Sequence, residues 1–509
     1  MASRGVLLAA ALLSAACAVG SNYRKPAVDT PEKYKELAAS PAAAPGAWKA
    51  AQPSDEAERG TWWEVFGDPG LDALEAQVAV SNQTIAQAEA QYRGARALAR
   101  VARASLFPDI ALAPSATRSS GVVKSATAPT GGAQPTVTTY SVPLELTWEA
   151  DVFGGVRRNV EAGVAAAQAS AAQLAGVRLA IQAELAVDYF SLHGLDAQRQ
   201  LLDSTVAGYQ TALQLTENRY KQGIVSGVDV AQAQTQLDTT RAQATDLAIA
   251  RAQLEHAIAV LVGKPPADFS LPVEPIRVAP PQVPAGLPSE LLERRPDVAA
   301  QERLVAAANA QIGVARAAYF PAFTLAASGG YQSTKLSSFF SLPNRFWSLG
   351  PALLETLFDG GRRRALSEQA WAGYDAAVAA YRQSALTAFA DVEDNLAALR
   401  ILAEEAGQQA EAVGAADRSL ELAKNRYQAG ITTYLEVVTA ETIALANQRT
   451  EVDLLTRRMA ASVNLVKALG GGWRDADLPA RREVTSRVAR PGPASTPAPA
   501  SPAASGAQR

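Results

Sequence analysis

One thirteen-residue phrase occurs twice in this chain, and it limits the possible folds more than any other feature. It reads NRYKQGIVSGVDV from Asn218 and NRYQAGITTYLEV from Asn425. Tyr220 and Tyr427 are 207 residues apart, and the central glycines and the acidic residues of the two phrases have the same spacing. Self-similarity at a fixed offset indicates an internal duplication. The fold must therefore accommodate two copies of one unit.

The composition favours helices and excludes a nucleic-acid partner. The 509 residues are 19% charged, the net charge is -3, the pI is about 5.7, and Ala, Gln and Leu are abundant. Such a composition is typical of a helix-rich protein. Phosphate binding needs a concentrated positive field, and neither the pI nor any Lys/Arg block of the sequence suggests a nucleic-acid groove. We therefore expect no nucleic-acid binding.

The first seventeen residues are typical of an export signal. Arg4 precedes an apolar run at 6–13, small residues follow at 14–16, and Cys17 is the single cysteine of the sequence. We predict a signal peptide at 1–16 and an extended arm at 17–60, anchored by lipidation of Cys17, with palmitate among the acyl chains. An ordinary cleaved signal that leaves a free thiol is the alternative.

Between this arm and a Pro/Ala-rich tail at 474–509, which is predicted to be disordered, both copies follow one order of elements. The order is a helix, a strand pair, a very long helix, a tip and a returning helix. The first copy is predicted at 61–263, an equatorial linker at 264–290 and the second copy at 291–473. The strand pairs are predicted at 107–152 and 320–358, and the tips at 220–229 and 427–436.

Hydrophobic periodicity predicts the helices. Leu71, Val78, Ile85 and Tyr92 are seven residues apart, which is typical of a coiled-coil seam, and this helix should end before Phe107. The two long helices are predicted at 156–222 and 362–429, each about 100 Å long at 1.5 Å per residue.

Each long helix should end at the repeated phrase. Gly223 and Gly430 suit left-handed helix caps, after which the chain reverses into a returning helix. The first returning helix, from Val228 to about Val262, covers half the way back, and a further helix at 291–319 should complete it. The phrase is therefore predicted to be the tip of a helical hairpin.

The strands alternate between apolar and polar residues. Val142, Leu144, Leu146 and Trp148 alternate with polar residues and a proline, which predicts a strand between two different solvents. No later stretch has the roughly 18 uncharged apolar residues of a spanning helix, so a membrane crossing would use strands. Four strands cannot close a barrel in lipid, whereas three chains would supply twelve. A soluble sheet with one wet face is the alternative.

At this point the sequence resembles the TolC-type outer-membrane efflux channels, and within them the lipoprotein branch that serves resistance-nodulation-division (RND) pumps. The resemblance covers about 17–473 and is carried by TWWEVFGDPGLDALEAQ from Thr61, LPSELLERRPDVAAQERLVAAANAQIGVARAAYFP from Leu287 and the two tip phrases. It implies a mainly helical fold with some β structure: a homotrimer with a long coiled-coil helical barrel in the periplasm and a twelve-stranded transmembrane β-barrel in the outer membrane of a Gram-negative bacterium.

The resemblance also implies partners and site residues. The tips would narrow the periplasmic entrance and contact a periplasmic adaptor protein, which links the channel to an inner-membrane RND transporter. Gate candidates are Asp229, Glu436, Tyr220 and Tyr427. Candidates for adaptor contact are Gly223, Ile224, Val225, Ser226, Gly227, Gly430, Ile431, Thr432, Thr433 and Tyr434, together with Val228 and Leu435.

The gate residues have plainer explanations. Asp229 and Glu436 could simply complement a helix N-terminus, and the tyrosines could be packing residues. The family often has a second acid three residues after the second one, but Thr439 stands there, which weakens the case for a double ring of carboxylates.

We expect no enzyme, cofactor or metal. The two histidines, His193 and His256, lie far apart in helical runs, and no nucleophile elbow or phosphate loop is present. The prediction is a channel that passively conducts small molecules from the adaptor and transporter to the exterior. A channel for protein (type I) secretion and a lipoprotein scaffold without a pore are the alternatives. The exported substrates are not indicated by the sequence.

Overall fold

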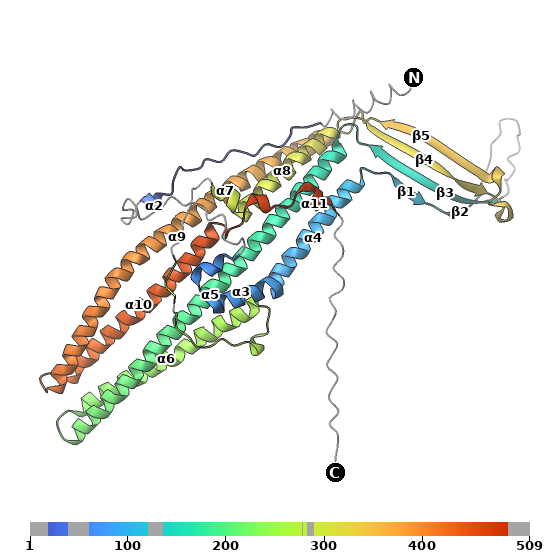
Figure 1. The fold of residues 1–509 in the computed structure, drawn as a ribbon. Helices are drawn as coiled ribbons and strands as arrows, with labels where there is room; N and C mark the ends of the chain where they lie inside the picture. Colours follow the sequence, from blue (N-terminus) through green and yellow to red (C-terminus); the bar gives the residue numbers. More distant parts are fainter. Residues whose placement is uncertain (1–18, 39–60, 121–135, 277, 282–289, 487–509) are drawn as a thin grey trace, which may run out of the picture.

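The computed structural model describes residues 19–38, 61–120, 136–276, 278–281 and 290–486. The predicted signal peptide, Cys17, most of the arm and the end of the tail lie outside the described residues. A long body of helices carries a narrow antiparallel sheet at one end and two helical hairpin tips at the other (Figure 1).

Six helices form the body, in three pairs of equal length. The long helices have 67 residues, the helices that return from the tips 35, and the helices that precede the strands 22. The long helices lie within one residue of their predicted bounds. The bounds are α5 Gly155–Lys221, α9 Arg362–Gln428, α6 Gly227–Leu261, α10 Tyr434–Ala468, α4 Gln83–Ala104 and α8 Pro296–Ala317.

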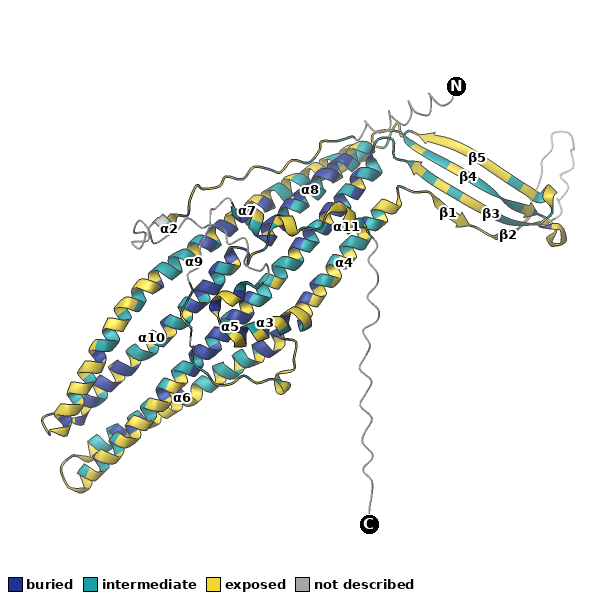
Figure 2. Cartoon of the chain, viewed as in Figure 1, coloured by how far each residue is buried: buried dark blue, intermediate teal, exposed yellow. Residues whose placement is uncertain are grey.

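The helices lie side by side in one layer. Near the sheet the order across the layer is α4, α5, α8, α9, and near the tips it is α6, α5, α10, α9. Helix α5 is therefore interior and α9 forms an edge. Although the two have the same length, α5 has twenty buried residues and α9 eight, and Figure 2 shows the same contrast.

The first predicted helix is interrupted, which corrects the continuous helix expected from Leu71 to Phe107. Helix α3 spans Pro69–Ser81, and the extended residue Asn82 separates it from α4. The Asn82 side chain accepts a hydrogen bond from Ile85 N at 3.0 Å and donates one to Leu261 O at 2.8 Å. Because one amide side chain caps α4 and binds the end of α6, the break is fixed in place.

The sheet has the order β1, β3, β4, β5, and β2 also pairs with β3. The first predicted strand is thus divided into two, around Pro114, which has no N–H to donate to a ladder. The bounds are β1 Asp109–Leu112, β2 Ser115–Ser119, β3 Val137–Ala150, β4 Ala322–Ser333 and β5 Arg345–Leu354.

The strand register sorts the side chains onto two faces. One row across the sheet is Ile110, Leu146, Ala327 and Leu349, and the next row on the same face is Leu112, Leu144, Gly329 and Trp347. Between them lies a row of the opposite face, formed by Ala111, Glu145, Ser328 and Ser348, in which the two serine hydroxyls are 2.8 Å apart. The alternation predicted from β3 therefore extends across β1, β4 and β5.

Each long helix begins at an aspartate that caps it. Asp151 accepts hydrogen bonds from Val156 N and Arg157 N, both at 2.9 Å. Asp359 accepts one from Arg363 N at 3.1 Å, and each aspartate also pairs with the guanidinium of the arginine that it caps. The two copies therefore make the same joint between sheet and helix. The aspartates differ in their distance from the Gly-Gly pair, since Asp151 is three residues before Gly154 and Asp359 directly precedes Gly360.

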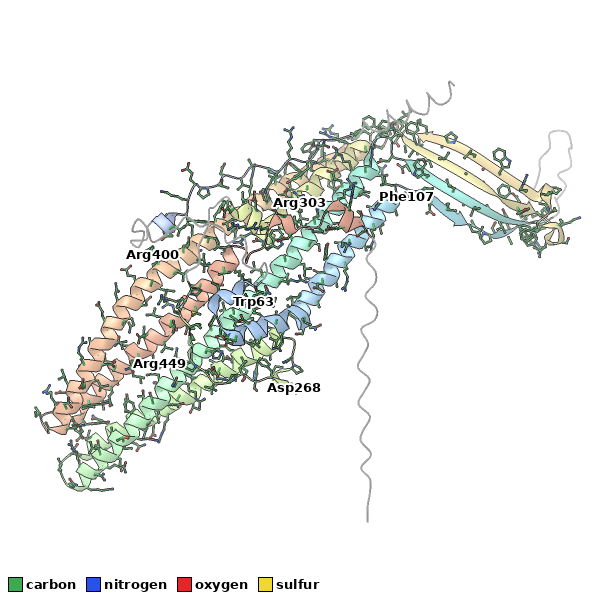
Figure 3. The ribbon with its side chains drawn as sticks, viewed as in Figure 1. Trp63, Phe107, Asp268, Arg303, Arg400 and Arg449 are labelled. Atoms are coloured by element: carbon green, nitrogen blue, oxygen red, sulfur yellow. The ribbon has the colours of Figure 1, made fainter. Side chains whose placement is uncertain are left out.

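Extended segments cross the body at mid-height. The arm, with the short helix α2 (Lys35–Ala38), buries Tyr34 against α9 and pairs Glu36 with Arg400 at 2.7 Å; Arg400 is labelled in Figure 3. On α5, Asp196 binds Arg251 at 2.7 Å, and Arg251 also donates to Leu271 O in the linker. The remaining short helices are 3-10 turns at Trp62–Phe66, Pro266–Asp268, Leu336–Ser338 and Leu342–Asn344, and α7 at Leu291–Arg294.

Part of the predicted disordered tail is folded, which is a second correction. Residues 474–486 form a 3-10 turn at Asp475–Asp477 and helix α11 (Arg481–Thr485). Val484 is fully buried in a cluster with α4 and α5, and Arg96 donates hydrogen bonds to carbonyl oxygens at the end of α11. One apolar anchor and these bonds hold a segment whose composition alone predicts disorder.

Helix α5 contains an eighteen-residue window that is apolar enough, by length and composition alone, to cross a membrane. In the structure this helix packs between α4, α6, α8 and α10. A third of that window is buried within the single chain.

The main hydrophobic core lies in the middle of the helical body and encloses a carboxyl group. Trp63, Phe66, Leu71 and Phe190 belong to this core, and Figure 3 labels Trp63 in the middle of the body. Glu75 on α3 is 0% exposed, and neither of its carboxylate oxygens has a hydrogen-bond partner. Burial, assisted by the nearby charge of Asp72, raises the pKa of Glu75 to about 9 from an ordinary value of 4.5.

We predict that Glu75 makes the stability of the protein fall as the pH rises. Between about pH 4.5 and 9 the folded chain holds a proton on Glu75 that the unfolded chain releases, at a cost of about 3 kcal/mol at pH 7. Glu75→Leu should therefore raise the apparent Tm in detergent, and its advantage over the wild type should be larger at pH 8 than at pH 5. Glu411→Leu, at an exposed position on α9, is the control. A Glu75→Leu effect that is independent of pH would refute this account.

Candidate functional site: the hairpin tips

The two tips share one backbone geometry, built around the repeated glycines. Gly223 has φ +72° and Gly430 φ +73°, in the left-handed region that favours glycine. Gly223 N donates to Tyr220 O and Ile224 N to Arg219 O, both at 2.9 Å. Gly430 and Ile431 make the equivalent bonds, so the predicted helix caps are confirmed.

The acidic residues of the two tips have different partners. Asp229 forms a capping box: its carboxylate accepts hydrogen bonds from the backbone N and the hydroxyl of Ser226, both at 2.9 Å. Glu436 instead pairs with Arg426 on the end of α9, at 3.4 Å, and both of these side chains are about half exposed. The helix-capping explanation therefore applies to Asp229, whereas Glu436 ties the two helices of its own hairpin together.

The two tyrosines also differ. Tyr427 is 7% exposed and its ring centroid lies 5.3 Å from that of Tyr434, in a small core with Ala233 and Val437. Tyr220, the equivalent residue, is 53% exposed. The structure thus makes Tyr427 a packing residue of the joint between the two hairpins and leaves Tyr220 at the surface.

Arg219 joins the two hairpins and was not among the residues singled out from the sequence. Its guanidinium donates to Tyr427 O and Gln428 O, both at 3.1 Å, and lies 4.8 Å from the centre of the Tyr427 ring. The Thr216 and Tyr427 hydroxyls are 3.5 Å apart beside it. The signal in the sequence is the repeated Asn-Arg-Tyr, which places an arginine before each tip tyrosine.

Both tips expose large apolar side chains among polar ones. Ile224, Val228, Ile431 and Leu435 are all more than half exposed. Of the candidates for adaptor contact, Tyr434 is different, because it is 2% exposed and packs inward. Most of the predicted contact residues therefore lie at the surface, but the Tyr434 side chain does not.

A carboxyl group is buried just behind the tips. Glu441 on α10 is 4% exposed and pairs with Lys424 on α9 at 3.3 Å. Burial raises the pKa of Glu441, while the Lys424 ammonium acts in the opposite direction. Burial, together with Glu441, also raises the pKa of Tyr434. This ion pair joins α9 to α10, the two helices of the second hairpin.

The described residues contain no group of three or more His, Cys, Asp and Glu side chains that could hold a metal ion. His193 is buried in the core of the body, where its Nδ1 lies against Glu274 O and 3.5 Å from Asp196. The histidine thus helps to hold the linker against α5, which is a structural role.

The sequence matches the family model described as outer membrane efflux protein at residues 74–264 and 287–471. It is 33% identical over 437 residues to the pyoverdine export outer membrane protein OpmQ of Pseudomonas aeruginosa, covering 85% of this chain and 92% of that protein. It is 31% identical over 471 residues to outer membrane protein OprJ of the same species, covering 91% and 94%. The toluene efflux pump outer membrane protein TtgF of Pseudomonas putida is 33% identical, covering 83% and 88%.

Solved structures agree with these relatives. The outer-membrane channel OprN superposes with a TM-score of 0.81 at 29% identity, covering 90% of this chain and 100% of that one. CusC, whose structures concern folding and transmembrane channel formation, gives 0.79 at 26% identity, covering 89% and 100%. The duplicated family match, the relatives and the fold agree, and the chain belongs to the outer membrane efflux protein family.

Proposed function

We propose that three copies of this outer-membrane efflux channel protein close into one continuous tube. The observation that carries the proposal is the pair of open edges on a single chain. The helical layer ends at α9 on one side and at α4 and α6 on the other. The sheet ends at β5 and at β1 with β2, on the corresponding sides.

Both edges carry groups that a neighbour would satisfy. Leu386, Ile401 and Leu422 on α9 are more than half exposed, as are Ile249 and Val260 on α6. Among the described residues, the edge strands β1, β2 and β5 have strand partners on one side alone, and lipid cannot hydrogen-bond the backbone groups of the other side. Pairing β5 of one chain with β1 and β2 of the next supports a barrel of twelve strand positions in a trimer.

The two faces of the sheet fit such a barrel. Trp347 and Leu349 belong to the rows of the apolar face and are strongly exposed on a single chain, whereas Glu145 and Ser328 belong to the other face. In a barrel, the apolar face would contact lipid and the polar face would line a water-filled lumen, so each face would lie in a matching solvent. The helices below would continue the lumen through the periplasm.

The tips are the proposed entrance and docking surface. Their exposed residues, led by Ile224, Val228, Ile431 and Leu435, would contact a periplasmic adaptor protein that connects the channel to an inner-membrane RND transporter. Asp229 and Glu436 from three chains would place rings of negative charge around the entrance. Opening would follow from contacts that the adaptor makes better with open tips than with closed ones.

Conduction through the tube is proposed to be passive, with the energy and the choice of substrate supplied by the transporter. Relatives are named for the export of pyoverdine, of toluene and of antibiotics, all of them small molecules. These names favour small-molecule efflux over protein secretion for this chain, and the apolar face of the sheet argues against a scaffold without a pore.

The lipid anchor is a further part of the proposal. The apolar run at 6–13, the small residues at 14–16 and Cys17 support acylation of the cysteine, and the lipid would then anchor the chain in the outer membrane. The arm beyond it, held by Tyr34 and Glu36 at mid-height, would run along the outside of the helices from the membrane.

We predict that the tip carboxylates restrict the channel and select cations. Asp229→Asn with Glu436→Gln removes the charges, and the amide oxygen introduced by the first substitution would still accept the Ser226 hydrogen bond that caps α6. In planar bilayers the double variant should conduct several-fold more than the wild type, and its reversal potential in a salt gradient should show weaker cation preference.

Asp29→Asn, an exposed position on the arm, is the matched control and should leave both quantities unchanged. If neither the wild type nor the variant conducts although the protein is folded, trimeric and inserted, the channel proposal is wrong. If the variant conducts with unchanged ion preference, the tip carboxylates are not at the entrance.

We also predict that the mature protein begins at an acylated Cys17. Intact-mass spectrometry of membrane-extracted protein should show the loss of residues 1–16 and the added mass of lipid on Cys17, and Cys17→Ser should abolish that mass. An unmodified cysteine thiol in the mature wild-type chain would exclude the anchor.

A further inference from the structure

The residues that join the two hairpins within one chain have equivalents at the edges of the chain, where they make no such contact with each other. Within the chain, Arg219 at the end of α5 donates to Tyr427 O and Gln428 O at the end of α9 and covers the Tyr427 ring. Adding the repeat offset of 207 to Arg219 gives Arg426, and subtracting it from Tyr427 and Gln428 gives Tyr220 and Lys221. The equivalent arginine, tyrosine and carbonyl oxygens therefore exist a second time.

These equivalent groups lie on opposite edges of the layer. Arg426 is at the end of the edge helix α9, and Tyr220 is at the end of α5 beside the other edge helix, α6. In the tip half the layer runs α6, α5, α10, α9, so a ring of copies places α9 of one chain next to α6 of the following chain. This arrangement repeats the packing of α5 against α10 within one chain, because α9 is equivalent to α5 and α6 to α10. Arg426 then faces the end of α5 in the neighbouring chain.

The state of these residues in a single chain agrees with a missing neighbour. Tyr220 is 53% exposed, whereas Tyr427 is 7% exposed. The Tyr220 ring lies beside Gly227, and a Cβ added to that glycine would be 3.7 Å from the ring. Arg426 is 55% exposed and has the Glu436 carboxylate at 3.4 Å. In the first copy the equivalent acid, Asp229, is engaged by Ser226, which leaves Arg219 free to reach across.

We propose that Arg426 of each chain donates hydrogen bonds to Tyr220 O and Lys221 O of the neighbouring copy and covers the Tyr220 ring, as Arg219 does within the chain. This inference rests on the proposed ring of three copies and identifies the contact that closes it at the tips. The entrance is then held by six arginine clamps, three within chains and three between them.

The clamp between copies is the weaker of the two kinds. Thr216, whose hydroxyl lies 3.5 Å from that of Tyr427, corresponds to Ala423, which has no hydroxyl. Tyr434, whose ring packs at a tilt against that of Tyr427, corresponds to Gly227, which has no ring. Glu436 also competes for Arg426. Opening of the entrance is therefore expected to begin at the seams between chains.

Crosslinking with a matched pair of variants tests the proposal. In the full chain, Arg426→Cys with Tyr220→Cys brings the two thiols together between copies, whereas Arg219→Cys with Tyr427→Cys, the equivalent pair, brings them together within one chain. A short bis-maleimide applied to the detergent-solubilised protein should convert the first variant to covalent dimers and trimers on a denaturing gel. The second should remain at monomer mass with an internal crosslink found by peptide mapping, and single-cysteine variants report any crosslink through Cys17.

The oligomeric state is measured on the same samples by analytical ultracentrifugation. If the protein is trimeric and the 219/427 pair crosslinks, but the 220/426 pair gives no product between chains, the clamp is refuted while the channel proposal stands. If the protein is not trimeric, both are refuted. In case the cysteine pairs disturb the tip, a photo-crosslinking phenylalanine at position 220 of an otherwise unchanged chain should attach to the end of α9 of another copy, and attachment elsewhere would overturn the proposal.

Discussion

Unpaired backbone groups at the two edges of the sheet are the constraint on which the rest of this structure depends. In the part of the chain that the structure describes, β5 on one side and β1 with β2 on the other each have an edge of N–H and C=O groups that pairs with no further strand. Such edges invite pairing with another chain, and in lipid they have no other solution. The helical layer repeats the problem, because α9 has the length of α5 but few of its buried residues. Ring closure resolves both at once.

Because of the duplication, ring closure can reuse contacts that already exist within the chain. The same two-helix hairpin, glycine cap and arginine occur in each copy, so one set of contacts serves inside the chain and, displaced by one step, between chains. The copies then differ where they meet different neighbours. Asp229 caps a helix while Glu436 holds an arginine, and Tyr427 is buried while Tyr220 is not.

Much of the fold could be predicted from the sequence, because the dominant signals are local and periodic. The helical runs that follow the Gly-Gly turns and end at the tip glycines placed the long helices within one residue, and the alternation in β3 predicted the two faces of the sheet. The break at Asn82 was missed, since the apolar spacing of Leu71, Val78 and Ile85 continues across it. Helix α11 was missed because a single buried valine and two arginines of α4 outweigh a composition that predicts disorder.

The site was less predictable than the fold. Acidic residues at the tips could be found by position, and Ser226, the partner of Asp229, stands three residues before it. The pairing of Glu436 with Arg426 depends instead on which helix end lies opposite, which is a tertiary property. Arg219 bonds to backbone carbonyl oxygens, and no pattern of side chains marks such an acceptor. The burial of Glu75 follows from the packing of α3 on α5, and its place in the sequence gives no sign that both oxygens lack a partner.

Hydrogen exchange of the strand amides tests the central claim of edge closure most directly. In the assembled protein in lipid nanodiscs, the amides of β5 at 345–354 and of β1 at 109–112 should be protected to the same degree as those of the interior strand β4. Fast exchange at β5 and β1 beside a protected β4 would show that the sheet edges remain open, and would contradict the account of the chain as one segment of a closed tube.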